Sequence, residues 1–148
     1  MENKKILVSA DEQSAVSRSL LLWFRTMPNK PFAKLNYEYL GPEPGYALST
    51  IQSAYKVRQY ITGGYRAQYQ FKVVCRVLPS NDDERLDAEE VTNAIGAWAE
   101  ANASSLDIGD SARVLSLDRD TVAALYARYE GGLEDYQILM TLNYEVNV

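Results

Sequence analysis

The sequence predicts an α+β fold, an antiparallel β-sheet with two α-helices packed on one face. Apolar residues recur at spacings of three and four over 9–27 and 81–103, which is the period of an amphipathic helix. Apolar and polar residues alternate over 60–77 and 136–146, which is the period of a strand with one buried face. No repeat or linker divides the 148 residues, so we expect one domain over 1–148.

The first helix is expected over 9–27. Ser9 followed by Glu12 matches a capping box, and Pro28 stops the helical pattern because proline cannot continue a helix. The apolar stripe of this helix consists of Val16, Leu20, Trp23, Phe24 and Met27.

Extended structure is expected after this helix. Apolar residues alternate from Phe32 to Tyr39, and the turn sequence GPEPG at 41–45 then interrupts regular structure. A short strand is expected over 46–51, before a hairpin centred on Gly63 and Gly64.

The apolar residues of this hairpin favour one register. A two-residue turn made of the two glycines alone would mix charged and apolar side chains on one face. A three-residue loop at 62–64 aligns the apolar rows instead, and it calls for a glycine with positive φ and a bulge. The expected pairs are Ile61 with Tyr65, Gln59 with Ala67, Val57 with Tyr69 and Tyr55 with Phe71.

The polar face of the hairpin is the candidate functional site, because it is basic and rich in amides on an otherwise acidic protein. Arginine, glutamine and tyrosine suit an interface with an acidic partner or with another copy of the chain. A merely solvated sheet face is the simpler alternative. The polar row comprises Lys56, Arg58, Tyr60, Arg66, Gln68, Gln70, Lys72 and Arg76. The interface candidates are Arg58, Tyr60, Gly63, Gly64, Arg66, Gln68 and Arg76.

The second helix, over 81–103, opens with acidic residues that suit the positive end of a helix dipole. A strand is expected at 113–117. Residues 121–130 fit both a helix and a strand, and the following Gly131-Gly132 pair favours a strand in a hairpin. The expected buried side of the second helix consists of Val91, Ile95 and Trp98, with the small residues Ala88, Ala94 and Ala101.

Composition argues against several classes of function. The chain has no histidine, which removes serine and cysteine nucleophiles paired with histidine and ordinary zinc sites. Cys75 is the single cysteine, so no disulfide is expected within the chain. The acidic residues of 82–90 are best explained as a helix start and a solvated face rather than as a metal site. We therefore expect no catalytic residue, no cofactor and no metal.

Charge and hydropathy indicate a soluble protein. A net charge of −5 argues against a protein whose main task is to grip nucleic-acid phosphate. No stretch approaches the roughly 20 apolar residues that a bilayer span requires, and the apolar run 6–8 is too short for a secretory signal. We expect folding in the cytoplasm and no membrane partner.

The order of four segments resembles a family of small tailed-phage proteins. These are the minor capsid or tail-terminator proteins of siphophages and prophages of Gram-positive hosts, and the resemblance covers about 11–147. Its most specific part is the hairpin pattern formed by Tyr60, Ile61, Gly63, Gly64, Gln68 and Phe71. The four segments are YLGPEPGYALSTIQ (39–52), VRQYITGGYRAQYQFKVVCR (57–76), GAWAEAN (96–102) and DYQILMTLNYEV (135–146).

The resemblance implies a tail terminator, a hexameric ring on the head-proximal end of the tail tube. Such a ring stops tube polymerisation, contacts the head connector and has no catalytic site. It belongs to the virion, is assembled in the host cytoplasm, and lets DNA pass through its lumen without specific binding. Arg58, Arg66 and Arg76 would then meet carboxylates of a neighbouring subunit or of the tube. The alternatives are another neck or head-completion protein, an enzyme that uses only carboxylates, lysine or a metal, and a small cellular binding module.

Overall fold

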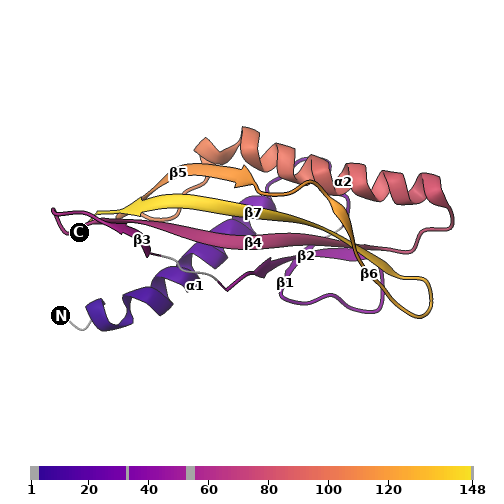
Figure 1. Cartoon of the computed structure of the whole chain (residues 1–148), viewed down its shortest axis with the longest axis horizontal. Coiled ribbons are helices and arrows are strands. Elements are labelled where there is room, and N and C mark those ends of the chain that lie inside the picture. Colours follow the sequence, from indigo (N-terminus) through magenta and orange to yellow (C-terminus); the bar gives the residue numbers. More distant parts are fainter. Residues whose placement is uncertain (1–3, 33, 53–55, 148) are drawn as a thin grey trace.

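The computed structural model describes residues 4–32, 34–52 and 56–147 (Figure 1). Its helices are α1 (Lys4–Phe24), α2 (Asp82–Ala101) and the short 3-10 helix η1 (Ala103–Ser105). Its strands are β1 (Leu35–Tyr37), β2 (Gly45–Thr50), β3 (Lys56–Gln59), β4 (Tyr65–Val77), β5 (Ala112–Arg119), β6 (Ala124–Arg128) and β7 (Glu134–Val146). The α+β class is therefore confirmed. No helix within these ranges is long and apolar enough to cross a bilayer.

The sheet is mixed, which corrects the expectation of a purely antiparallel sheet. The described residues form seven strands in the order β1-β2-β4-β7-β5, with β3 added to β4 and β6 added to β7. Strand β1 runs parallel to β2, while every other described pair is antiparallel. Glu38, with φ of 58°, ends β1, and its carboxylate accepts hydrogen bonds from the Ser49 hydroxyl and the Thr50 N–H.

Strands β4 and β7 form the centre of the sheet and pair along their whole length, from Tyr65 opposite Val146 to Val77 opposite Glu134. Strands β5 and β6 share the other edge of β7, where they lie end to end (Figure 1). The sheet therefore has two distinct ends. The β3–β4 end holds the hairpin that joins those strands, and the β6–β7 end holds the hairpin that joins β6 to β7.

Both helices contribute to one core on one face of the sheet, as predicted. Successive side chains of a strand point to opposite faces, so the odd-numbered residues of β4 and the even-numbered residues of β7 share this core. The rings of Trp23 on α1 and Trp98 on α2 lie 4.6 Å apart between centroids, which joins the two helices. The opposite face is formed by the other residues of β4 and β7 and their neighbours. No helix of the described residues packs on it, and we call it the open face.

The helices differ in detail from the sequence prediction. Ser9 lies inside α1, so the predicted capping box is wrong. Helix α2 begins after Asn81, whose side-chain oxygen accepts a hydrogen bond from the Glu84 N–H at 3.0 Å. Val91, Ala94 and Ala101 were expected on its buried side but are exposed. Ala88 and Ile95 are buried as predicted, and Thr92, Gly96 and Ala99 complete the buried side of α2.

The predicted hairpin has the right loop length and the wrong register. Gln59 pairs with Tyr65 and Arg58 with Arg66, and the Tyr60 N–H donates to the Gly64 carbonyl at 2.8 Å. The loop is therefore 61–63 instead of 62–64. The predicted bulge and positive φ are both present, the latter at Gly63 with φ of 101°. Ile61 lies at the exposed tip and not opposite Tyr65.

Residues 121–130 contain strand β6, which confirms the strand interpretation. Its hairpin with β7 closes like the first one, since the Tyr129 N–H donates to the Leu133 carbonyl and the Gly132 N–H donates to the Tyr129 carbonyl. Gly131 and Gly132 both have positive φ, which explains the glycine pair at this turn. The predicted pair of Tyr55 with Phe71 lies outside the described residues.

Candidate subunit interface

The structure brings six of the seven candidate residues together and separates the seventh. Arg58, Tyr60, Gly63, Gly64, Arg66 and Gln68 lie at the β3–β4 end of the sheet. Arg76 lies ten residues further along β4 than Arg66, which corresponds to about 33 Å at the usual rise of a strand. One contact with a small partner surface cannot include both arginines.

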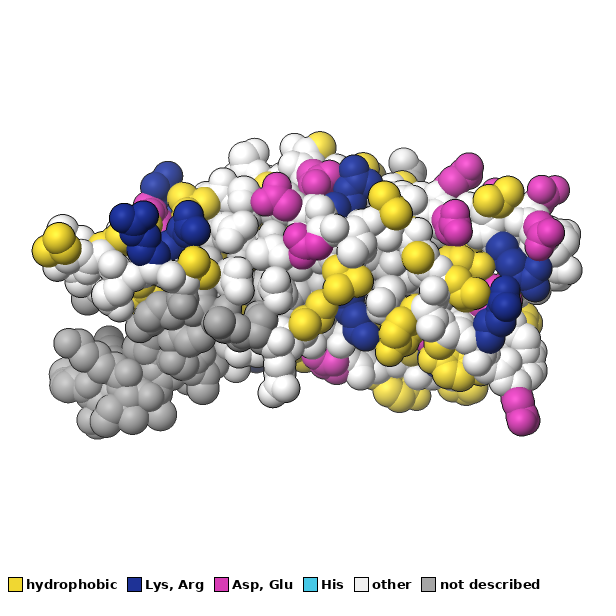
Figure 2. Space-filling model, in the orientation of Figure 1, with side chains coloured by type: hydrophobic (Ala, Val, Ile, Leu, Met, Phe, Trp, Pro, Cys, Tyr) yellow, Lys and Arg dark blue, Asp and Glu magenta, His cyan; other side chains and the backbone are white. Residues whose placement is uncertain are grey.

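A charged row crosses four strands at the β3–β4 end. Arg58 of β3 lies opposite Arg66 of β4, Arg66 opposite Glu145 of β7, and Glu145 opposite Arg113 of β5. The row thus holds three guanidinium groups and one carboxylate. Figure 2 shows this basic group at the left end of the molecule.

The Glu145 carboxylate pairs with Arg113 and not with Arg66, its other neighbour in this row. Arg113 pairs with its carboxylate, and the Tyr60 hydroxyl donates to it at 3.2 Å. The hydrogen bond from Arg113, aided by its charge, lowers the pKa of Glu145, so this carboxylate stays ionised. Within the described part of the chain, neither Arg58 nor Arg66 has an ion pair or a side-chain hydrogen bond. Two exposed, unpaired arginines therefore face each other across the hairpin.

The two glycines hold the hairpin against the end of β7. Gly63 takes the positive φ that closes the loop. A Cβ on Gly64 would lie 2.6 Å from the backbone oxygen of Val146, a distance that real Cβ atoms do not show. Gln68 lies farther along β4, opposite Asn143, and is half-buried. These residues fix the position of the hairpin, whereas Arg58 and Arg66 supply its exposed positive charges.

Arg76 has a different role from the one expected, because it is already paired within the chain. Its guanidinium makes two parallel bonds to the Asp135 carboxylate, at 2.7 and 2.9 Å, and donates to the Gly41 carbonyl at 2.8 Å. It also lies over the Tyr129 ring, 4.7 Å from the centroid. These contacts fasten the turn after β1 and the β6–β7 hairpin to the open face.

Glu134, the residue before Asp135, forms a matching cluster on the helix side of the sheet. Arg85 of α2 and Arg128 of β6 pair with it at 3.2 and 3.1 Å, and the Tyr136 hydroxyl donates to it at 3.0 Å. Burial raises the pKa of the Glu134 carboxyl, but these hydrogen bonds outweigh burial and lower the pKa below its usual value. The second basic group in Figure 2, at the right end, is thus largely neutralised by internal ion pairs.

Exposed aromatic residues near the β6–β7 end belong to the candidate surface but were not among the predicted site residues. Tyr126 lies under the Lys72 ammonium at 4.7 Å, and Tyr39, Tyr126 and Tyr129 are all exposed. Tyrosine and arginine are enriched where a partner covers a surface. The sequence placed Tyr126 and Tyr129 beside a glycine turn, but only the pairing of β6 with β7 puts them on the open face.

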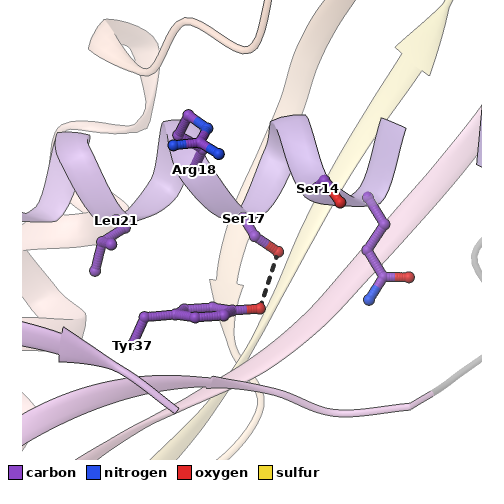
Figure 3. Close-up of a pocket in the computed structure, with 6 residues that line it drawn as sticks. Ser14, Ser17, Arg18, Leu21 and Tyr37 are labelled. Carbon is purple, nitrogen blue, oxygen red and sulfur yellow. Dashed lines mark hydrogen bonds between the residues drawn. The ribbon is translucent and has the colours of Figure 1, made fainter. Parts of the chain in front are cut away.

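A groove of about 450 Å³ lies between α1 and β1 and is lined by Gln13, Ser14, Ser17, Arg18, Leu21 and Tyr37. Figure 3 shows Ser17 pointing at Tyr37 and Arg18 pointing away from it. Behind these residues the Tyr69 hydroxyl bonds to Ser17 and to Thr50, both at 2.6 Å, and burial raises the pKa of Tyr69 to about 12. These neutral hydroxyls form a structural network between helix and sheet. Among the described residues, no group of carboxylates and cysteine is placed to hold a metal ion.

Comparisons with known proteins give low likenesses only. No family model and no curated protein matches the sequence. One solved structure with a similar chain is the virion of a native gene transfer agent particle. That chain is 15% identical, with 90% of this chain and 93% of the other covered and a TM-score of 0.43. A second solved chain, which carries no descriptive name, is 18% identical over 97% and 96% of the two chains, with a TM-score of 0.45. At these scores neither likeness carries an argument about function.

Proposed function

We propose that this protein is a structural component of a tailed-phage virion, a tail terminator that assembles as a hexameric ring on the head-proximal end of the tail tube. The ring stops tube polymerisation and joins the tail to the head connector. Two features support the proposal: the resemblance carried by the order of the sequence segments 39–52, 57–76, 96–102 and 135–146, and an α+β domain whose open sheet face has no helix over it.

The observation that carries the proposal is the pair Arg58 and Arg66. Like charges directly opposite each other in a sheet are destabilising, so the pair carries a cost in the isolated subunit. A partner carboxylate removes that cost and gains charge-assisted hydrogen bonds. The partner is acidic, either another copy of this chain, whose net charge is −5, or the tube.

The mechanism of termination is geometric and uses no catalytic group. The last ring of the tube presents subunit edges that bind one face of the terminator ring. The other face offers no template for a further tube ring and meets the head connector instead. DNA passes through the lumen without being held, in keeping with the acidic surplus of the chain, because phosphate binding requires a basic surface.

Electron microscopy of the purified protein, mixed with the tail tube protein from the same genome, tests this proposal. Tubes that carry a ring at one end and stop growing are the expected result. The same mixture without this protein gives the reference distribution of tube lengths. Uncapped tubes that continue to grow would overturn the terminator role and direct attention to the head connector.

A further inference from the structure

The tip of the β3–β4 hairpin carries an apolar side chain with nothing to cover it. Ile61 is fully exposed, at 106% of its reference area, between the two strands that bear Arg58 and Arg66. Burial of an isoleucine side chain is strongly favourable, so a partner that covered Ile61 would gain from the contact. The hairpin is therefore a projecting apolar knob with two unpaired arginines at its base.

A complementary pocket lies at the other end of the molecule. Its volume is about 310 Å³, and it is formed where β4 ends and α2 begins. Its apolar walls include Phe32, Leu78, Pro79 and Val91, of which Leu78 and Val91 are themselves exposed. Glu84 and Asp87 of α2 stand at the same pocket. Within the described residues the Asp87 carboxylate has no ion pair and no hydrogen bond, and the Glu84 carboxylate accepts one hydrogen bond, from the Ser80 N–H.

The knob and the pocket cannot meet within one chain. They lie beyond opposite ends of β4, whose 13 residues span about 40 Å. Figure 1 shows the hairpin at one extremity of the molecule and the start of α2 at the other, and Figure 2 shows acidic side chains gathered over that second extremity. The apolar character and the charge of the two surfaces are matched, as expected of two halves of one interface.

We infer that the Ile61 knob of one copy inserts into this pocket of a second copy, where Arg58 and Arg66 meet Asp87 and Glu84. The inference deepens the proposed function, on which it rests, by naming the two surfaces that join neighbouring subunits. Because the two surfaces differ, the contact is heterologous, and the joined pair of copies retains one free knob and one free pocket. Such a contact gives a ring where the rotation between copies closes.

A cross-linking experiment tests the contact directly. Ile61→Cys combined with Val91→Cys places one thiol on the knob and one in the pocket, about 40 Å apart in a single chain. Oxidation should give a ladder of covalent multimers that ends at the ring. Cys75 also lines this pocket but is fully buried, and burial raises the pKa of its thiol to about 11; Ile61→Cys alone measures any cross-linking to it.

The matched control combines Val91→Cys with Val122→Cys, since Val122 is equally an exposed apolar residue but lies in the turn between β5 and β6. It should give no ladder. If the Ile61 and Val91 pair gives no ladder, both in concentrated free protein and in protein added to tail tubes, the inference is wrong.

Mixing two defective variants tests whether the contact is heterologous. Ile61→Asp removes the knob and Val91→Glu blocks the pocket, and each alone should weaken self-association by about tenfold or more. Mixed together, they retain one working knob and one working pocket, so the pair should form a dimer and nothing larger. Sedimentation velocity measures the size of the species that each variant and the mixture form. Assembly of either variant alone to the wild-type size would overturn the inference.

Tube capping separates this inference from the proposed function. If Ile61→Asp protein caps tubes as the wild type does, the terminator role stands and the knob contact falls. If the cysteine pair gives closed covalent rings but wild-type protein leaves tubes growing, the contact stands and the terminator role falls.

Discussion

Arg76 and Asp135 face each other directly across β4 and β7, and two parallel hydrogen bonds join their side chains. The arginine side chain is 14% exposed and the aspartate side chain 4% exposed, so water screens this pair little. The same arginine reaches the carbonyls of Leu40 and Gly41. One ion pair therefore links the turn before β2, the central strands and, through Tyr129, the β6–β7 hairpin.

Replacement of this pair should destabilise the fold. Arg76→Ala leaves the buried Asp135 carboxylate without its countercharge, and we expect the free energy of unfolding to fall by about 3 kcal/mol. Arg113→Ala is the matched control, because Arg113 pairs with Glu145 but is 65% exposed, and its removal should cost less than about 1 kcal/mol. Urea denaturation measures both. Equal losses in the two variants would contradict the structural role given to Arg76.

Stability should fall in acid through Glu134. Its pKa in the folded state lies below the ordinary value of 4.5, because the hydrogen bonds from Tyr136, Arg85 and Arg128 outweigh the effect of burial. A group with a lowered folded pKa contributes stability above its unfolded pKa and loses that contribution as pH falls through the folded value. Thermal melts of Glu134→Gln between pH 7 and pH 3 should show a lower melting temperature at pH 7 and a flatter decline below pH 4.5. The exposed Glu130→Gln should follow the wild type.

Gly64 should not tolerate a side chain. In Gly64→Ala the new Cβ would meet the backbone oxygen of Val146 at 2.6 Å, and a backbone atom of the central strand cannot move aside cheaply. We expect a loss of about 1–3 kcal/mol. Gly45→Ala is the control, since a Cβ there meets nothing within 4 Å, and it should be neutral. A neutral Gly64→Ala in the same urea titration would show that the hairpin does not need its close approach to β7.

Arg66→Glu should impair assembly without affecting the fold. Arg66 is exposed and unpaired within the described residues, so the free energy of unfolding should change by no more than about 0.5 kcal/mol, as for ordinary surface substitutions. The fraction of capped tubes should drop, because the substitution places like charges at the expected contact. Arg18→Glu makes the same change of charge on an exposed residue of α1 and should cap normally. Unchanged capping by Arg66→Glu would remove the charged row from the interface.

The central strands were predictable because their pattern is long. Apolar and polar side chains alternate along most of the 13 residues of β4 and the 13 of β7. The apolar set faces the core and the polar set faces the opposite side, as the alternation predicts. The hairpin register was not predictable in the same way. The apolar rows favoured a partner for Ile61, but the closing bond from Tyr60 to Gly64 moves the pairing by two residues and leaves the same faces aligned.

The position of charges depended on long-range pairing that periodicity does not contain. Arg76 and Arg66 look equivalent along β4, and only the register with β7 puts Asp135 beside one and Glu145 beside the other. The parallel pairing of β1 with β2 was missed for a related reason. A connection this short between parallel strands is unusual, and Glu38 at its start has the left-handed conformation, which is uncommon for residues other than glycine.

Strand β7 lies between β4 on one side and β5 with β6 on the other. Strands β5 and β6 therefore cannot join the sheet until residues 134–146 have paired with β4. During synthesis the preceding elements leave the ribosome first, and β4 must then wait for a partner that is about 60 residues behind it. Strands β2 and β3 precede β4 and can cover its other edge, but until β7 arrives the edge of β4 that pairs with it is open to other chains. A subunit of high contact order is therefore slow to become competent for assembly. In the proposed assembly, the concentration of folded copies, rather than of translated chains, would set how soon rings form.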